Sequence, residues 1–236
     1  MKEKLYTIPV NDAFREDCEC PLCVMYRQLE TDALRFTMSG YMVEEQRAKS
    51  NLAGFCERHV RMLSEGEDRL GLAWMLKTHM EHVIREVESR QNSPVKQASF
   101  FKKKAEPSEL SDYLDHLNHS CFVCDQIDSM FERYQVTIFY LYKKDADFRA
   151  LFGQSKGFCT SHYEMLYRMA PSQLSGELLR QFVTELNRLY LENMKRVCDD
   201  VSWFIDKFDY RFKDEPWKTS RDAIPRAMTK LDSLLP

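Results

Sequence analysis

The chain has 236 residues and a formal net charge of −3; 44% of its residues are apolar and 30% are charged. That length suffices for one large domain or two small ones around a buried core. With 7 glycines and 8 prolines, each makes up about 3% of the chain, too little for the many tight turns of an all-β fold. The composition therefore predicts a soluble, mostly helical protein. It also argues against a nucleic-acid binder, because a net positive field is what attracts phosphate.

The sequence shows no targeting or membrane segment. Residues 1–10 are partly charged and lack the apolar run of a secretory signal. No stretch approaches the roughly 18 apolar residues of a membrane span. We therefore expect a cytoplasmic protein without membrane contact. In a reducing compartment, its eight cysteines are better candidates for metal or redox chemistry than for disulfides.

The first predicted element is a helix that begins at the motif Cys-Pro-Leu-Cys, residues 20–23. Pro21 suits the first turn of a helix, where its missing N–H is not needed. Apolar residues then recur at a spacing close to 3.6, at Met25, Tyr26, Leu29, Ala33, Leu34, Phe36 and Tyr41. The cysteine pair thus lies at the N-terminus of a long helix.

Next in the chain is the motif Gly-Phe-Cys-Glu-Arg-His, residues 54–59, which we expect to start another helix. Ser64 and Glu67 then have the spacing of a capping box. We expect this box to open a helix that extends through Val87. Residues 93–110 lose the helical periodicity and contain three consecutive lysines and Pro107, which predicts a solvated linker.

The second half repeats both motifs. Cys-Phe-Val-Cys occupies 121–124 and Gly-Phe-Cys-Thr-Ser-His occupies 157–162, so the offsets from the first copies are 101 residues (20 to 121) and 103 residues (54 to 157). These motifs contain six of the eight cysteines and two of the six histidines. Repetition of so many rare residues predicts an internal duplication.

The C-terminal part begins with a long apolar stripe. It predicts one helix over about residues 173–210, on the order of 55 Å long at 1.5 Å per residue. We expect this helix to pack across the domain; projection into a protein partner is the alternative. Residues 211–236 form an arm that we expect Trp217 to anchor on the body, with partner binding through the arm as the other possibility.

The predicted architecture is all-α, with two similar helical units. The first unit spans 1–92, the linker 93–110, the second unit with the long helix 111–210, and the C-terminal arm 211–236. The sequence leaves the oligomeric state open.

Three cysteines and one histidine are a common tetrahedral ligand set for zinc. Residues three apart at a helix start lie on the same side, and the positive end of the helix favours the thiolate. We expect two zinc ions per chain, each bound by the pairs of one half: Cys20, Cys23, Cys56 and His59, and Cys121, Cys124, Cys159 and His162. Exchange of the pairs between the halves uses the same eight ligands and stays open.

Two other uses of these residues stay open as well. A helical core can bury cysteines without an ion, and mainly cysteine ligation also suits an iron–sulfur cluster. Ligation by four residues argues against catalysis, because catalytic zinc keeps a position for water. A c-type haem site needs histidine directly after the cysteine pair, where this chain has Val24 and Asp125.

Weaker candidates lie outside the motifs. His79 and His82 are three residues apart, with Glu86 one turn further; a polar helix face is the simpler interpretation and a metal site the alternative. Cys18 is a candidate redox thiol or a substitute for Cys20.

Three further residues complete the candidates. His116 and His119 precede the second cysteine pair and would either replace a ligand or bind nothing. Cys198, on the long helix, is predicted to be a small buried apolar residue.

The duplicated Cys-x-x-Cys and Gly-Phe-Cys-x-x-His motifs resemble those of an uncharacterised bacterial family classed as a domain of unknown function. The resemblance extends from the first motif through the long helix. It implies an all-helical architecture and no particular activity.

The sequence thus favours a zinc-binding interaction or scaffold protein without catalytic activity. One alternative is a thiol redox sensor or zinc-linked switch, in which oxidation of a Cys-x-x-Cys pair releases the metal. The other is an enzyme with a site in a cleft between the two units that uses His79, His82 or Glu86.

Overall fold

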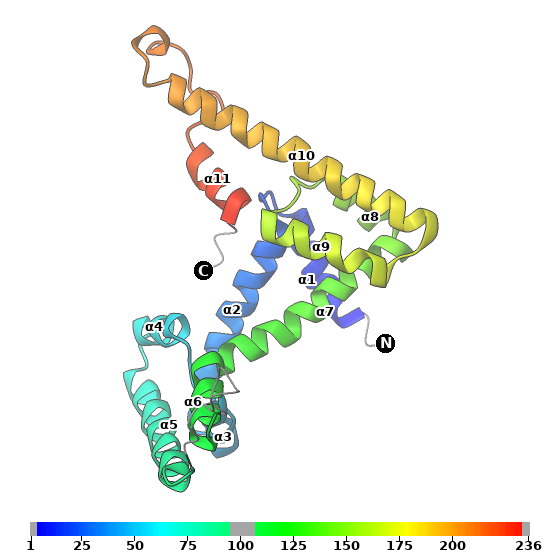
Figure 1. Cartoon of the computed structure of the whole chain (residues 1–236). Helices are drawn as coiled ribbons and strands as arrows, with labels where there is room; N and C mark the ends of the chain where they lie inside the picture. Colours follow the sequence, from blue (N-terminus) through cyan, green and yellow to red (C-terminus); the bar gives the residue numbers. More distant parts are fainter. Residues whose placement is uncertain (1–3, 95–106, 233–236) are drawn as a thin grey trace, which may run out of the picture. The chain divides into compact units, whose positions relative to one another are not determined.

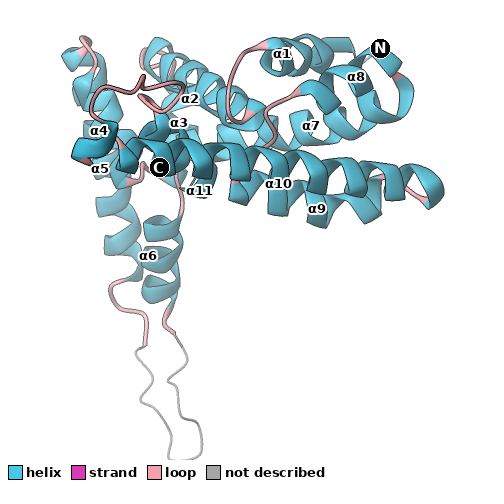
Figure 2. Ribbon diagram, turned by 90° about the horizontal axis from the view of Figure 1, so that it is seen from above, coloured by secondary structure: helices cyan, strands magenta, loops and turns pink. Residues whose placement is uncertain are grey.

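The computed structural model describes residues 4–94 and 107–232. Over these residues the chain forms eleven α-helices and no strand (Figure 2), which confirms the all-α prediction. The central part of the predicted linker, 95–106, lies outside the described residues.

The chain forms two compact units, each with residues from both sequence halves. Unit 1 comprises Met1–Gln28 and Met130–Pro236, and unit 2 comprises Leu29–Ser129. These bounds differ from the predicted division at 93–110, which followed the repeat of the motifs. Helices α2 (Pro21–Ser39) and α7 (Phe122–Lys144) contribute residues to both units.

Unit 1 contains most of the aromatic core. Its further helices are α1 (Lys4–Arg15), α8 (Ala146–Gln154), α9 (Thr160–Gln173), α10 (Gly176–Asp206) and α11 (Ala223–Asp232). The fully buried ring of Phe152 contacts the rings of Phe14, Tyr142, Phe158 and Phe182. This cluster joins α1, α7, α8 and α10 to the loop that precedes α9.

The long helix α10 lies entirely in unit 1. Its 31 residues give a length of about 46 Å at 1.5 Å per residue, slightly shorter than predicted. It packs against α9 and α11, and α11 also packs against α9 (Figure 1). The expected anchor is present, because the Trp217 ring contacts Phe204 in the last turn of α10 and Phe208 just after the helix.

Unit 2 contains the other helices: α3 (Glu44–Ala53), α4 (Glu57–Glu65), α5 (Arg69–Arg90) and α6 (Glu109–His119). Helix α5 packs against each of the other three. Leu63, Leu72 and Met75 are buried here. None of the helices in the described part of the chain combines the length and the apolar character needed to cross a bilayer.

The predicted capping box at 64–67 is wrong. Helix α4 continues to Glu65, and the Ser64 hydroxyl donates to the Arg61 carbonyl within its last turn. The N-cap of α5 is Asp68, whose carboxylate accepts from the Gly71 amide at 2.7 Å. Ser64 is therefore engaged in the preceding helix, and an acidic residue four positions later caps the next one.

Candidate metal centres

The eight predicted ligands form two clusters, and within each cluster the ligand atoms all lie within 4.8 Å of one another. Site 1 consists of Cys20, Cys23, Cys159 and His162; site 2 consists of Cys56, His59, Cys121 and Cys124. The favoured pairing within each half is therefore wrong, and the exchanged pairing is the one in the structure. Each Cys-x-x-Cys helix start meets the Cys-x-x-His helix start of the other half.

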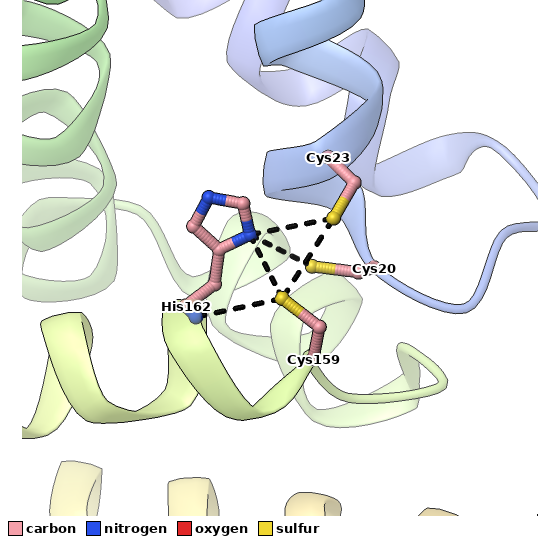
Figure 3. A group of neighbouring side chains, drawn as sticks. All are labelled: Cys20, Cys23, Cys159 and His162. Atoms are coloured by element: carbon pink, nitrogen blue, oxygen red, sulfur yellow. Dashed lines mark hydrogen bonds between the residues drawn. The ribbon is translucent and has the colours of Figure 1, made fainter. Parts of the chain in front are cut away.

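Site 1 lies in unit 1, between the starts of α2 and α9 (Figure 3). Cys20 directly precedes α2 and Cys23 lies in its first turn. Cys159 is the N-cap of α9, where its sulfur accepts from the backbone amide of His162. The imidazole Nδ1 of His162 and the three sulfurs converge, and all four residues are buried.

Site 2, in unit 2, repeats this arrangement between α4 and α7. Cys56 is the N-cap of α4, with His59 in the first turn. Cys121 directly precedes α7 and Cys124 lies in its first turn. Both predicted kinds of motif therefore start helices. In contrast to site 1, Cys56 and Cys124 are only half-buried.

The spacing of the ligand atoms fits a single tetrahedral ion. Bonds of about 2.3 Å to sulfur and 2.0–2.1 Å to nitrogen place two sulfurs about 3.8 Å apart, and sulfur and nitrogen about 3.6 Å apart. In site 1, His162 Nδ1 lies 3.4, 3.4 and 3.1 Å from the sulfurs of Cys20, Cys23 and Cys159, and the Cys23 and Cys159 sulfurs are 3.7 Å apart.

The corresponding distances in site 2 are similar. His59 Nδ1 lies 3.3, 3.4 and 3.3 Å from the sulfurs of Cys56, Cys121 and Cys124. The sulfurs of Cys56 and Cys124 are 4.0 Å apart. The four ligands of an iron–sulfur cluster are divided among two or more iron atoms, so they do not all lie as close together as the ligands of one ion. The geometry therefore favours single ions at both sites.

The glycine before each Cys-x-x-His motif is required by the backbone. Gly54 and Gly157 have φ values of 63° and 74°, in the left-handed region that glycine tolerates best. A Cβ on Gly157 would also lie 2.8 Å from the backbone carbonyl oxygen of Leu189. The adjacent Phe158 is fully buried against Phe14 and Phe152, so the ligand loop is anchored in the aromatic core.

A buried carboxylate supports the histidine of site 2. Glu30 on α2 is 5% exposed, and its Oε1 lies 3.1 Å from His59 Nε2. Arg58 donates to both oxygens of Glu30 at 2.8 Å. A carboxylate on the outer nitrogen fixes the ring orientation and makes the histidine a better ligand. At site 1, the His162 ring packs edge-on against Phe131.

Glu30 was not identified in the sequence, and no local signal distinguishes it. It is one of two acidic residues in α2, the other being Asp32, and it lies outside every motif. Its role depends on the packing of α4 against it. Arg58 lies within the motif at 54–59, but nothing in the sequence indicates that it pairs with Glu30.

The clustered side chains shift one another's pKa values. Hydrogen bonds to Cys159 and Cys20, together with burial, raise the pKa of Cys23. Burial and the neighbouring charge of Cys121 raise the pKa of Cys124. Thiolates this close repel one another, whereas a bound metal ion stabilises them and deprotonates coordinating thiols outright.

The weaker candidates lie outside both clusters. His79 Nδ1 lies 3.1 Å from the Asn51 carbonyl oxygen, and Glu86 pairs with Arg90. Among the described residues, no potential metal cluster of three or more ligands includes His79, His82 or Glu86.

The remaining histidines and cysteines are not ligands of either cluster. His116 and His119 belong to α6, and the exposed His119 ring lies 2.7 Å from the Asp115 carbonyl oxygen. Burial raises the pKa of Cys18 to about 11, which disfavours its reactive thiolate at neutral pH. Cys198 is exposed, so the prediction that it is buried is wrong.

The fold and the sites define an all-α protein with two Cys3His clusters at helix N-termini. The chain belongs to the Family of unknown function (DUF6062), whose model matches residues 1–236. This confirms the resemblance in the motifs. No curated protein and no solved structure matches the chain.

Proposed function

We propose that this protein is a cytoplasmic zinc-binding interaction or scaffold protein whose two Cys3His sites are structural. The main support is the tetrahedral spacing of three sulfurs and one nitrogen at each site. Four protein ligands leave no position for a reacting water, as is typical of structural zinc. Metal binding energy then becomes folding energy, because the unfolded chain has no preformed site.

The zinc ions would fix helix starts that are far apart in the sequence. Cys23 and Cys159 are separated by 136 residues, and Cys56 and Cys124 by 68. Each ion would therefore close a long loop and hold two ligand-bearing helices in a defined geometry. We propose that this rigid arrangement presents a surface to a protein partner, either on α10 or on the C-terminal arm.

Elemental analysis of the chain purified without added metal tests the zinc proposal. We expect about two zinc ions per chain, with Cys56→Ser and Cys159→Ser each losing one. Fewer than one ion of any metal per chain would contradict the proposal. Iron and inorganic sulfide in place of zinc would favour a cluster instead.

Two double variants test the exchanged pairing. Cys20→Ser/Cys159→Ser removes two ligands of one site, so we expect it to retain one zinc. Cys20→Ser/Cys56→Ser damages both sites and is expected to retain none. Pairing within the halves would give the opposite result.

The half-burial of Cys56 and Cys124 favours a second candidate function, a zinc-linked redox switch at site 2. Two thiolates would lose two electrons to a peroxide and form a disulfide, while the peroxide is reduced and the zinc is released. Thiol counting and zinc release under peroxide test this function. If peroxide releases one zinc and oxidises two thiols in the wild type but not in Cys56→Ser, the result supports a switch. If zinc is released only when the protein unfolds, site 2 is static.

A further inference from the structure

The two ligand loops of site 2 are tied together by direct hydrogen bonds. The Ser120 hydroxyl, one residue before Cys121, donates to the carbonyl of Ala53 at 2.8 Å. The backbone amide of Phe122 donates to the carbonyl of Gly54 at 3.0 Å. These bonds hold the Cys-x-x-Cys loop against the loop that leads into Cys56.

The corresponding positions at site 1 are Glu19, one residue before Cys20, and Lys156, three residues before Cys159. Both offer a backbone carbonyl here, and a third residue bridges them. The ammonium group of Lys230 on α11 donates to the Glu19 carbonyl at 2.7 Å and also to the Lys156 carbonyl. Lys230 thus takes the place of the Ser120–Ala53 hydrogen bond of site 2.

The backbone of Lys230 adds a further contact with the same loops. Its carbonyl accepts from the hydroxyl of Thr160, the residue after Cys159, at 3.0 Å. One residue of the C-terminal helix therefore touches the chain directly before Cys20 and on both sides of Cys159.

The side chain of Lys230 is buried among groups that can stabilise a positive charge. The residue is 1% exposed, and a buried ammonium group is costly unless it is paired and hydrogen-bonded. The Glu19 carboxylate lies 3.2 Å from Lys230 Nζ and also accepts from Arg196 of α10. Arg226, one turn before Lys230, pairs with Asp200 of α10 at 2.8 Å. The C-terminal helix is thereby fixed to α10 while its lysine reaches the ligand loops.

We propose that Lys230 is a positioning residue for site 1, so that α11 locks this metal site and leaves site 2 independent. This inference rests on the proposed zinc function. Without the lysine, the two loops would lose their common donor and the Glu19 carboxylate its buried partner. The ligands of site 1 would then separate more readily, and its metal would leave faster.

Zinc transfer to a colorimetric chelator tests the proposal on the full chain. Each site is expected to give one kinetic phase of zinc release. The phase that disappears in Cys159→Ser is assigned to site 1, and the phase that disappears in Cys56→Ser is assigned to site 2. We expect Lys230→Met to accelerate the site 1 phase about tenfold, the lower end of the effect of outer-shell partners on metal sites. The site 2 phase should be unchanged. Lys213→Met, an exposed lysine of the same arm, is the matched control.

A rescue variant separates positioning from general loosening of the arm. In Glu19→Ser/Lys230→Met, the introduced hydroxyl takes the position that Ser120 has at site 2, where it donates to the Ala53 carbonyl, and the carboxylate that loses its lysine partner in Lys230→Met is removed. We expect release from site 1 to be slower than in Lys230→Met. If Lys230→Met lacks native helicity, Thr160→Val and the double variant test the proposal instead. For Thr160→Val we expect about twofold faster zinc release from site 1.

Unchanged site 1 release in Lys230→Met, or in Thr160→Val where the first variant does not fold, would overturn the lock. Equal acceleration of both phases would also overturn it. A wild-type chain that binds no metal would instead overturn the proposed zinc function, so the two failures are distinguishable.

Discussion

At the scale of single residues, small chemical differences separate two candidate metal sites that share a ligand set. Site 1 is buried and its histidine packs against Phe131, whereas His59 of site 2 is held by the Glu30 carboxylate. Outer-shell carboxylates orient the ring and increase its basicity. The two ions are therefore expected to respond to different substitutions.

The first prediction concerns Glu30→Gln. Loss of the carboxylate on His59 Nε2 is expected to lower the metal affinity of site 2 by about tenfold and to leave site 1 unchanged. Competition for zinc with a chelator of known affinity measures the metal affinity of each site. The control is Glu57→Gln, which changes an exposed carboxylate in the first turn of α4, the helix that carries His59. Equal effects of the two variants would contradict the role of Glu30.

The second prediction compares two glycines with positive φ. A Cβ on Gly157 would meet the Leu189 carbonyl at 2.8 Å, whereas one on Gly176 would meet nothing within 4 Å. Gly176→Ala is therefore expected to lower the free energy of unfolding by about 1 kcal/mol, the cost of placing alanine in the left-handed conformation. Gly157→Ala adds a backbone clash next to site 1, for a total of about 2–4 kcal/mol. Urea unfolding of the zinc-loaded protein measures the difference, and equal costs would show that the loop adapts.

At the scale of elements, helix N-termini organise the molecule. All four ligand pairs lie at the starts of helices, namely α2, α4, α7 and α9. The unpaired amides and the positive dipole end favour the thiolate form there. The candidate metal sites thus combine a property of every helix start with the Cys and His side chains that the motifs place there.

The third prediction tests which residue caps α5. Asp68→Ala removes a side chain that accepts from the Gly71 amide at 2.7 Å, and it is expected to destabilise the protein by about 1 kcal/mol. Ser64→Ala removes only a hydroxyl bond to the Arg61 carbonyl and should cost less than about 0.5 kcal/mol. Thermal unfolding of the two variants measures this, and the reverse order would restore the capping box.

At the scale of the whole molecule, each compact unit contains one complete candidate metal site. Site 1 belongs to unit 1 and site 2 to unit 2, and each combines ligands from both sequence halves. A ligand that binds only the folded state stabilises it by about 2.7 kcal/mol at one hundred times its Kd. Metal occupancy is therefore expected to control the stability of each unit separately.

The fourth prediction follows from this division. A strong chelator is expected to lower the Tm of the protein markedly, since the metal stabilises only the folded chain. In hydrogen-exchange experiments, Cys159→Ser should increase amide exchange in α9 and α11, whereas Cys56→Ser should increase it in α4. Uniform changes across both units would contradict the assignment of one site to each.

The sequence by itself determined the all-α class, the helix starts at the four motifs and the eight residues that form the two candidate metal sites. These depend on local features: the apolar period of 3.6, the i, i+3 spacing and the few residue types that bind zinc. It also located the loop glycines, Gly54 and Gly157, although only the structure shows the carbonyl that leaves no room for a Cβ at Gly157.

Only the tertiary structure decided how the ligands pair. Loop closure favours joining Cys23 to Cys56, 33 residues away, over Cys159, 136 residues away, but by only about 1 kcal/mol, because its entropy grows with the logarithm of length. Helix packing outweighs so small a preference. The same holds for Glu30 and Lys230, whose roles come from neighbours that are distant in the sequence and leave no trace in the local pattern.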